Sequence, residues 1–365
     1  MAFYPSPKLQ LHAQEAAHRH PLDDSERFWA HEAAQIQWHK LPSAILQESE
    51  KALKSGILHP TWSWFPDGEF STCFNCVDRH VQAGRGESLA LIWDSPVTGS
   101  KLQFTYNQML HEVETLAGVL REQGVGKGDV VLIYTQGELD WNHLVENAKR
   151  RNLKAQVVPV KSNDPIYVLF TSGTTGSPKG VVREAAGHAV GMSFCMRSKF
   201  GVQGPGDVVF AASDIGWVFG HSFIVYGPLL AGAATILFEG KPIGTPDAGT
   251  FWRIVSEYKV NMLCTAPSAL RAIRSHDPGD RLFKQMGTSG ALRSLRAIFL
   301  AGERSEPNLV QLYSKFLQNY SASPSLVIDN WWSTETGSPI TGTAMEVVAD
   351  EIRSLGPGTK PMGRT

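Results

Sequence analysis

The sequence predicts an α/β fold in which a largely parallel sheet is covered by helices. Apolar residues make up 42% of the 365 residues, enough for a large core, and charged residues only 19%. This composition excludes an intrinsically disordered chain. Short apolar runs alternate along the chain with stretches of helical spacing. That rhythm is typical of parallel strands that are buried on both faces and joined by helices.

The elements can be assigned in chain order. We expect residues 1–60 to form a polar helical lead-in, with Ser25 as the N-cap of its helix. Between strands over residues 89–95 and 130–134 we expect a helix over residues 107–123. The remaining apolar runs predict strands over residues 166–171, 208–212, 235–239, 261–264, 295–300 and 326–328. Further helices are expected over residues 267–275 and 307–318.

Charge and cysteine content exclude several classes of protein. Lys and Arg number 34 against 35 Asp and Glu, so there is no basic surplus to hold a nucleic acid backbone, and no nucleic-acid partner is expected. Four cysteines in a chain of this length indicate a reducing compartment rather than a disulfide scaffold. The N-terminus lacks the apolar stretch of a secretory signal. We expect a cytoplasmic protein, with the mitochondrial matrix as the alternative.

One uncharged stretch, residues 215–238, is long enough to cross a membrane. It is interrupted by glycines and by the pair Gly227-Pro228. We interpret it as two buried elements of the core and expect no membrane span.

The strongest chemical motif is YVLFTSGTTGSPKGVV, residues 167–182. Glycines let a backbone approach a ligand closely and point N–H groups at it, while hydroxyls add donors. Lys179 adds a positive charge. We therefore interpret the segment as a polyphosphate-binding loop rather than an ordinary turn between two strands. The candidate phosphate-binding residues are Thr171, Ser172, Gly173, Thr174, Thr175, Gly176 and Lys179.

Other motifs are absent or weak. The chain contains neither a Walker loop nor a G-x-S-x-G elbow, which disfavours a P-loop ATPase and a serine hydrolase. Cys73 and Cys76 form C-x-x-C with His80 beyond, but a zinc site needs a fourth ligand. We interpret these cysteines as buried small side chains. Five histidines near the N-terminus match no metal-ligand spacing.

The segment TSGTTGSPKG resembles the signature of the adenylate-forming superfamily of acyl-CoA synthetases, adenylation domains and luciferases. Further segments resemble its acetate- and propionate-activating branch, and together they cover most of residues 25–345. They are FWAHEAAQIQW, WFPDGEFSTCFNCVDRH, DIGWVFGHSFIVYGPLLAGAATILFEGKPIGTPDAG, FLAGERSEP and DNWWSTETGSPI. The resemblance implies an acetyl-CoA synthetase-type lead-in over residues 1–60, an adenylation domain over 61–345 and a divergent tail over 346–365, without the family's small C-terminal domain.

The resemblance also implies an acid–thiol ligase that uses ATP, Mg²⁺ and coenzyme A. ATP and a carboxylate give acyl-AMP and pyrophosphate, and the thiol of coenzyme A then displaces AMP. Thr334 matches the α-phosphate contact, and Glu335 matches the Mg²⁺ ligand, for which a carboxylate is suitable. The other residues implied at the nucleotide are Gly302, Glu303, Arg304, Asn330 and Trp331.

The same resemblance implies a small acyl pocket lined by Trp217, Val218, Phe219 and Trp332. Two indoles across a small cavity would exclude long acids. Ala301 is small and leaves room for one methylene more than acetate, so propionate is expected to be at least as good a substrate as acetate. Plain core packing of the tryptophans is the alternative.

The chain departs from the family at two places. A block is missing at the 134/135 junction, and its loss is expected to expose apolar surface on its former neighbours. The C-terminal Lys that the family uses for adenylation has no counterpart, which is expected to lower the rate by on the order of 10² to 10³. Three interpretations remain: a short-chain ligase, a non-catalytic nucleotide-binding or interaction remnant, and a shortened gene product that folds poorly.

Overall fold

The centre of the protein is an eight-stranded, mostly parallel sheet. The structure is a computed structural model that describes residues 24–52, 56–131, 141–172, 176–321 and 325–345. Across the sheet the strands are, in spatial order, β14 (Thr341–Gly342), β13 (Leu326–Trp331), β12 (Ala297–Leu300), β11 (Met262–Thr265), β9 (Val208–Ala211), β10 (Ala234–Phe238), β4 (Leu89–Ser95) and β5 (Ser100–Thr105). Only the two edge strands, β5 and β14, pair antiparallel. The predicted α/β fold is confirmed.

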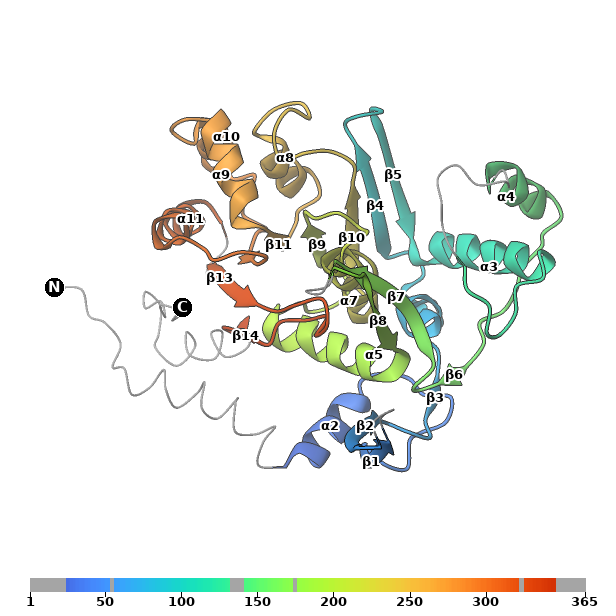
Figure 1. Ribbon diagram of the computed structural model, residues 1–365. Helices are drawn as coiled ribbons and strands as arrows, with labels where there is room; N and C mark the ends of the chain where they lie inside the picture. Colours follow the sequence, from blue (N-terminus) through green and yellow to red (C-terminus); the bar gives the residue numbers. More distant parts are fainter. Residues whose placement is uncertain (1–23, 53–55, 132–140, 173–175, 322–324, 346–365) are drawn as a thin grey trace.

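Helices cover both faces of this sheet (Figure 1). One face carries α8 (Thr250–Glu257), α9 (Pro267–His276), α10 (Arg281–Thr288) and α11 (Pro307–Tyr320). The other carries α5 (Ala185–Phe194), η3 (Cys195–Lys199), η4 (His221–Tyr226) and α7 (Gly227–Ala231). In β9, Val208 and Phe210 pack on the first face, while Val209 and Ala211 pack on the second. Burial on both faces explains why the strands are continuously apolar.

Beyond β5 lie α3 (Tyr106–Glu122) and α4 (Trp141–Arg150), which pack against each other (Figure 1). A capping box starts α3, because the Thr105 hydroxyl accepts from the Gln108 N–H while the Gln108 side chain accepts from the Thr105 N–H. The expected helix over residues 107–123 is therefore confirmed to within a residue. The helices expected over residues 267–275 and 307–318 are confirmed as α9 and α11.

The N-terminal region is only partly helical. Helix α2 (Ser25–Ala33) is capped by Asp24, whose carboxylate accepts from the Arg27 N–H, so the assignment of Ser25 as N-cap was wrong by one residue. The helical prediction was also wrong for the hairpin of β1 (Leu46–Ala52) and β2 (Leu58–Trp64). Continuous cross-strand pairing, with the Ser49 and Thr61 hydroxyls 2.8 Å apart, outweighs the helix propensity of the polar sequence of β1.

Two strand predictions had a different outcome. Val130 and Val131 lie outside any strand, and Val130 is 92% exposed; the rest of residues 130–134 lies outside the described residues. The strand expected over residues 166–171 is confirmed as β7 (Pro165–Thr171), but it pairs with β8 (Lys179–Glu184) in a separate hairpin. The short strands β3 (Glu69–Phe70) and β6 (Val160–Lys161) also pair apart from the main sheet.

The uncharged stretch 215–238 contains α6 (Val218–Gly220), η4, α7 and β10 rather than one long helix. Among the described residues, no helix combines the length and apolar character needed to cross a membrane.

The C-x-x-C pair lies where the chain enters η1 (Phe74–Asp78), which is followed by η2 (Val81–Arg85). Cys76 is buried, which confirms the interpretation for that residue, and Cys73 is half-buried. Burial, with the charge of Asp78, raises the pKa of Cys73 to about 11, and burial also raises the pKa of Cys76. Both are therefore thiols at neutral pH, unlike reactive cysteines.

Candidate nucleotide site

The parallel sheet brings three of the motif segments to one edge. Since β9, β12 and β13 run in the same direction, the segments that follow them emerge together at the carboxyl edge. These segments are residues 212–217, 301–304 and 332–337. The chain passes from β9 to β10 on one side and then to β11 on the other side of β9. Ligands of open α/β sheets bind at such a switch point.

The phosphate-loop candidate lies at the turn of the β7–β8 hairpin. Thr171 pairs with Lys179 at the last register position before the loop. Ser172, Gly176 and Lys179 are exposed, and Gly176 has a φ of +84°, a conformation that favours glycine. The residues Gly173, Thr174 and Thr175 lie outside the described residues.

Arg183 joins this hairpin to the segment that contains Thr334 and Glu335. Its guanidinium donates to the carbonyl oxygens of Thr334 at 2.7 Å, Glu335 at 3.1 Å and Thr336 at 3.4 Å. Gly337 has a φ of +73°, which favours glycine, and a Cβ there would lie 2.8 Å from Arg183 Nη2 and displace the guanidinium. The Ser222 hydroxyl holds the same turn from η4 by donating to the Gly337 carbonyl at 2.6 Å.

Sequence reasoning missed Arg183. The available signal was an arginine that follows the apolar pair Val181-Val182, four residues after Lys179. A lone basic residue there is equally compatible with an exposed position, so its partners could not be predicted without the fold.

Glu335 is exposed and ionised. The Ser333 side-chain hydrogen bond is the main cause that lowers the pKa of the Glu335 carboxyl, assisted by the backbone N–H of Glu335 and the charges of Arg183 and Lys179. A hard cation that is also held by phosphate oxygens needs an ionised oxygen ligand of this kind. The donor chemistry at this position therefore fits Mg²⁺.

The segment after β12 is also exposed, apart from its first residue. Ala301 is buried, and Gly302 has a φ of +96° with open space where a Cβ would be. Glu303 accepts two hydrogen bonds from Arg271 Nη2, at 2.9 and 3.0 Å, which lower the pKa of Glu303. The Glu303 carboxylate is thus already paired with Arg271. A nucleotide base that lay along this segment would therefore contact the backbone of residues 302–304.

Asn330 and Trp331 differ in environment at the end of β13. Asn330 Oδ1 is buried and has no hydrogen-bond partner within the described ranges, whereas Trp331 is 63% exposed. The Ser305 hydroxyl donates to Asp329 Oδ1 at 2.9 Å and so joins the segment after β12 to β13.

The residues expected around the acyl group are only partly brought together. Trp332 packs on Phe219, with ring centroids 5.4 Å apart, and Val218 is buried nearby in the same helical segment. Trp217 is 69% exposed and does not close a cavity against Trp332 in this structure. Core packing is therefore the wrong alternative for Trp217 and Trp331, while Trp332 does pack against the core.

Comparisons of the sequence with known proteins identify related chains. Residues 136–362 match the family described as AMP-binding enzyme, and residues 14–76 match the acetyl-coenzyme A synthetase N-terminus. The chain is 37% identical over 412 residues to Acyl-CoA synthetase short-chain family member 3, mitochondrial, from Homo sapiens, covering 89% of this chain and 57% of the relative. It is 30% identical over 453 residues to acetyl-coenzyme A synthetase from Pseudoalteromonas atlantica, covering 97% of this chain and 66% of the relative.

The chain thus spans 57% to 66% of the length of these relatives. An alignment of 412 positions that includes 89% of a 365-residue chain must contain gaps in that chain. Such gaps are compatible with an internal missing block, whose predicted position at the 134/135 junction lies outside the described residues.

Proposed function

Because the chain belongs to the AMP-binding enzyme family, we propose that it binds ATP at the carboxyl edge of the sheet and activates a short-chain carboxylate for transfer to coenzyme A. The observation that carries this proposal is the Arg183 link. It joins the hairpin that bears the phosphate loop to the turn that bears Thr334 and Glu335. Two segments far apart in sequence can thereby act on one triphosphate.

In the proposed first step, a carboxylate oxygen of the acid attacks the α-phosphorus of ATP. The new P–O bond forms as the bond to pyrophosphate breaks, and acyl-AMP remains. Lys179 and the loop N–H groups would hold the β- and γ-phosphates, and the Thr334 hydroxyl would donate to the α-phosphate. Mg²⁺, held by Glu335 and phosphate oxygens, would supply positive charge toward the leaving pyrophosphate.

In the proposed second step, the thiol of coenzyme A loses its proton to solvent and its sulfur attacks the acyl carbon. The bond from that carbon to the phosphate oxygen breaks, and AMP leaves with the bonding electrons. No described residue is assigned to the coenzyme, so this step is supported by the names of the relatives alone.

The proposed acid is propionate or acetate, with propionate at least equal. Ala301 is buried and directly precedes Gly302. In the proposed acyl pocket its small side chain would leave room for one methylene more than acetate. Ala301→Val should fill that space and move the preference toward acetate by roughly 10- to 200-fold, the range for one methylene. A ratio unchanged in Ala301→Val, or a strong preference for acetate in the unaltered chain, would place the acyl pocket elsewhere.

The direct test is propionate-dependent exchange between ATP and pyrophosphate. Glu335→Gln should abolish exchange, while Glu48→Gln removes an exposed carboxylate of β1 and should leave it intact. Equal exchange in the two variants would reject the role of Glu335. Exchange that is absent from the folded, unaltered chain would instead favour the second candidate function below.

That second candidate is nucleotide binding without turnover. The exposure of Val130 and Val131 favours this second candidate, because apolar residues that were expected in a buried strand are in contact with solvent. Calorimetric titration with ATP and Mg²⁺ separates the two candidate functions, since binding without exchange is expected of a non-catalytic chain.

We also propose that the protein is located in the mitochondrial matrix, supported by the word mitochondrial in the name of the human relative. Subcellular fractionation would test this location.

A further inference from the structure

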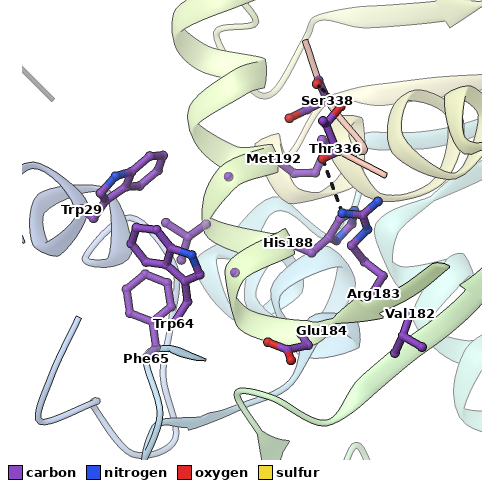
Figure 2. Close-up of a pocket in the computed structure, with 13 residues that line it drawn as sticks. Trp29, Trp64, Phe65, Val182, Arg183, Glu184, His188, Met192, Thr336 and Ser338 are labelled. Carbon is purple, nitrogen blue, oxygen red and sulfur yellow. Dashed lines mark hydrogen bonds between the residues drawn. The ribbon is translucent and has the colours of Figure 1, made fainter. Parts of the chain in front are cut away.

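A cavity of about 400 Å³ lies between strand β8, helix α5 and helix α2 (Figure 2). It does not include residues 302–304 or the segment proposed for the acyl group. Helix α2, strand β2, strand β8, helix α5 and the turn after Trp332 contribute to its walls. None of the residues 217–219 and 301–304 lines it. The cavity therefore needs an explanation of its own.

One side of the cavity is aromatic. Trp29 and Trp64 lie edge to face, with ring centroids 5.6 Å apart, and Phe65 stands beside Trp64 (Figure 2). Flat apolar bodies bind well against such walls, because indoles offer a large contact area at a low cost in side-chain entropy.

The facing side contains polar atoms that have no partner within the described ranges. His188 is buried, and neither Nδ1 nor Nε2 has a hydrogen-bond partner there. Burial, with the charges of Arg183 and His221, lowers the pKa of His188 to about 3, so the ring is neutral at pH 7 and one nitrogen carries a hydrogen. Arg183 Nε is also buried without a partner. Buried polar groups left unpaired are costly, and a ligand would relieve that cost.

The polar side of the cavity carries a positive charge, that of Arg183. Arg183 lies next to His188, whereas Glu184 points to the opposite end of the cavity from Thr336 and Ser338 (Figure 2). The Glu184 carboxylate is engaged there with Asn163 at 2.8 Å. An anionic group is therefore favoured beside His188 and Arg183.

The space itself results from two glycines on α5. A Cβ at Gly191 would meet nothing within 4 Å, and one at Gly187 would meet Trp64 at 3.7 Å. Glycine within a helix is less stable than alanine by about 1 kcal/mol. The open volume at Gly191 is thus maintained at a cost in helix stability.

We propose that this cavity is a binding site for an aromatic monocarboxylate, with its ring against Trp29 and Trp64 and its carboxylate accepting hydrogen bonds from His188 and Arg183. The site is distinct from the proposed substrate site and does not depend on the proposed activity. Arg183 lines the cavity and also donates to the carbonyl oxygens of Thr334 and Glu335. A ligand in the cavity would therefore contact the residue that holds this turn.

The test uses 3-phenylpropionate as the probe and 3-phenylpropanamide as its neutral match, with binding measured by calorimetry. The acid should bind at least tenfold more tightly than the amide. Gly191→Leu, which fills the cavity, and His188→Phe, which keeps a ring but removes both nitrogens, should each weaken binding at least tenfold. Gly126→Leu, at an exposed glycine outside the cavity, is the control and should bind as the unaltered chain does.

Several results would overturn the proposal. Equal affinity for acid and amide would reject the role of His188 and Arg183, and this comparison needs no variant. Undiminished binding to a folded Gly191→Leu would place the probe elsewhere. Competition with propionate in pyrophosphate exchange would mean that the probe enters the substrate site instead.

Discussion

Arg183 Nη2 donates a hydrogen bond of 2.7 Å to the carbonyl oxygen of Thr334. The β7–β8 hairpin shares no strand pairing with the central sheet, so this contact and its neighbours at Glu335 and Thr336 fix one motif relative to the other. A guanidinium suits this task because its planar fork reaches several oxygens at once.

Removing Arg183 is expected to weaken both stability and nucleotide binding. Arg183→Leu leaves carbonyl oxygens without a charged donor, which should lower the free energy of unfolding by about 1–3 kcal/mol. ATP affinity should fall with it, since Glu335 is no longer held near Lys179. Arg183→Lys keeps the charge without the fork and should be intermediate. Urea unfolding and ATP titration measure both effects.

The matched control is Arg150→Leu, because Arg150 is exposed at the end of α4, outside the β7–β8 hairpin. If Arg183→Leu behaved like this control in both measurements, the three hydrogen bonds would have no bearing on the site.

The contribution of Glu335 to binding Mg²⁺ with ATP is expected to be independent of pH near neutrality, because the carboxylate stays ionised there. The pKa of the Glu335 carboxyl is lowered from its ordinary value, so the charged form is complete above that value, about 4.3, and is lost only as pH falls through the lowered one. The terminal phosphate of ATP titrates equally in the unaltered chain and in Glu335→Gln, so the difference in their Mg²⁺-dependent ATP affinities should be flat between pH 6 and 8. An apparent pKa above 5 that disappears in Glu335→Gln would contradict this.

The six inner strands of the central sheet could be predicted because burial on both faces leaves continuous apolar runs, whereas the exposed edge strands β5 and β14 were not predicted. Strand β7 gives the same pattern but belongs to a hairpin outside that sheet. A local sequence does not specify which edge a strand joins, since pairing is a long-range contact. Strand β1 was missed for a related reason, because its polar residues are stabilised by the facing β2.

The candidate site was predicted as a set of segments, and parallel strand order explains why three of them meet. What could not be predicted was their mutual orientation. Trp217 and Trp332 each match the same expected pocket, yet only Trp332 packs inward. The direction of a side chain after a strand end depends on the turn, which composition does not encode.

Truncation of the adjacent tryptophans Trp331 and Trp332 should have very different effects on the free energy of unfolding. Trp332 contacts Phe219 and Phe223, each with ring centroids 5.4 Å away, so Trp332→Ala should lower the free energy of unfolding by about 2–3 kcal/mol. Trp331 is mainly exposed, and Trp331→Ala should change it by less than about 0.5 kcal/mol. Urea unfolding of both variants measures the difference. Equal losses would mean that Trp331 is covered in solution.

The outer face of the β7–β8 hairpin is expected to cause self-association. Val168 and Val182 face each other across the strands, and Phe170 follows on the same face with 71% of its surface exposed. A two-stranded hairpin with an uncovered apolar face is marginally stable and tends to associate. Phe170→Ser should therefore lower the apparent mass and the light scattering of concentrated protein, measured by sedimentation and static scattering.

Leu41→Ser is the matched control, because Leu41 is also 71% exposed but lies outside the hairpin. If exposure alone drove association, both variants would reduce scattering equally. If the hairpin face is responsible, only Phe170→Ser does so, and adding Val168→Thr should reduce scattering further, because both substitutions make the same face polar.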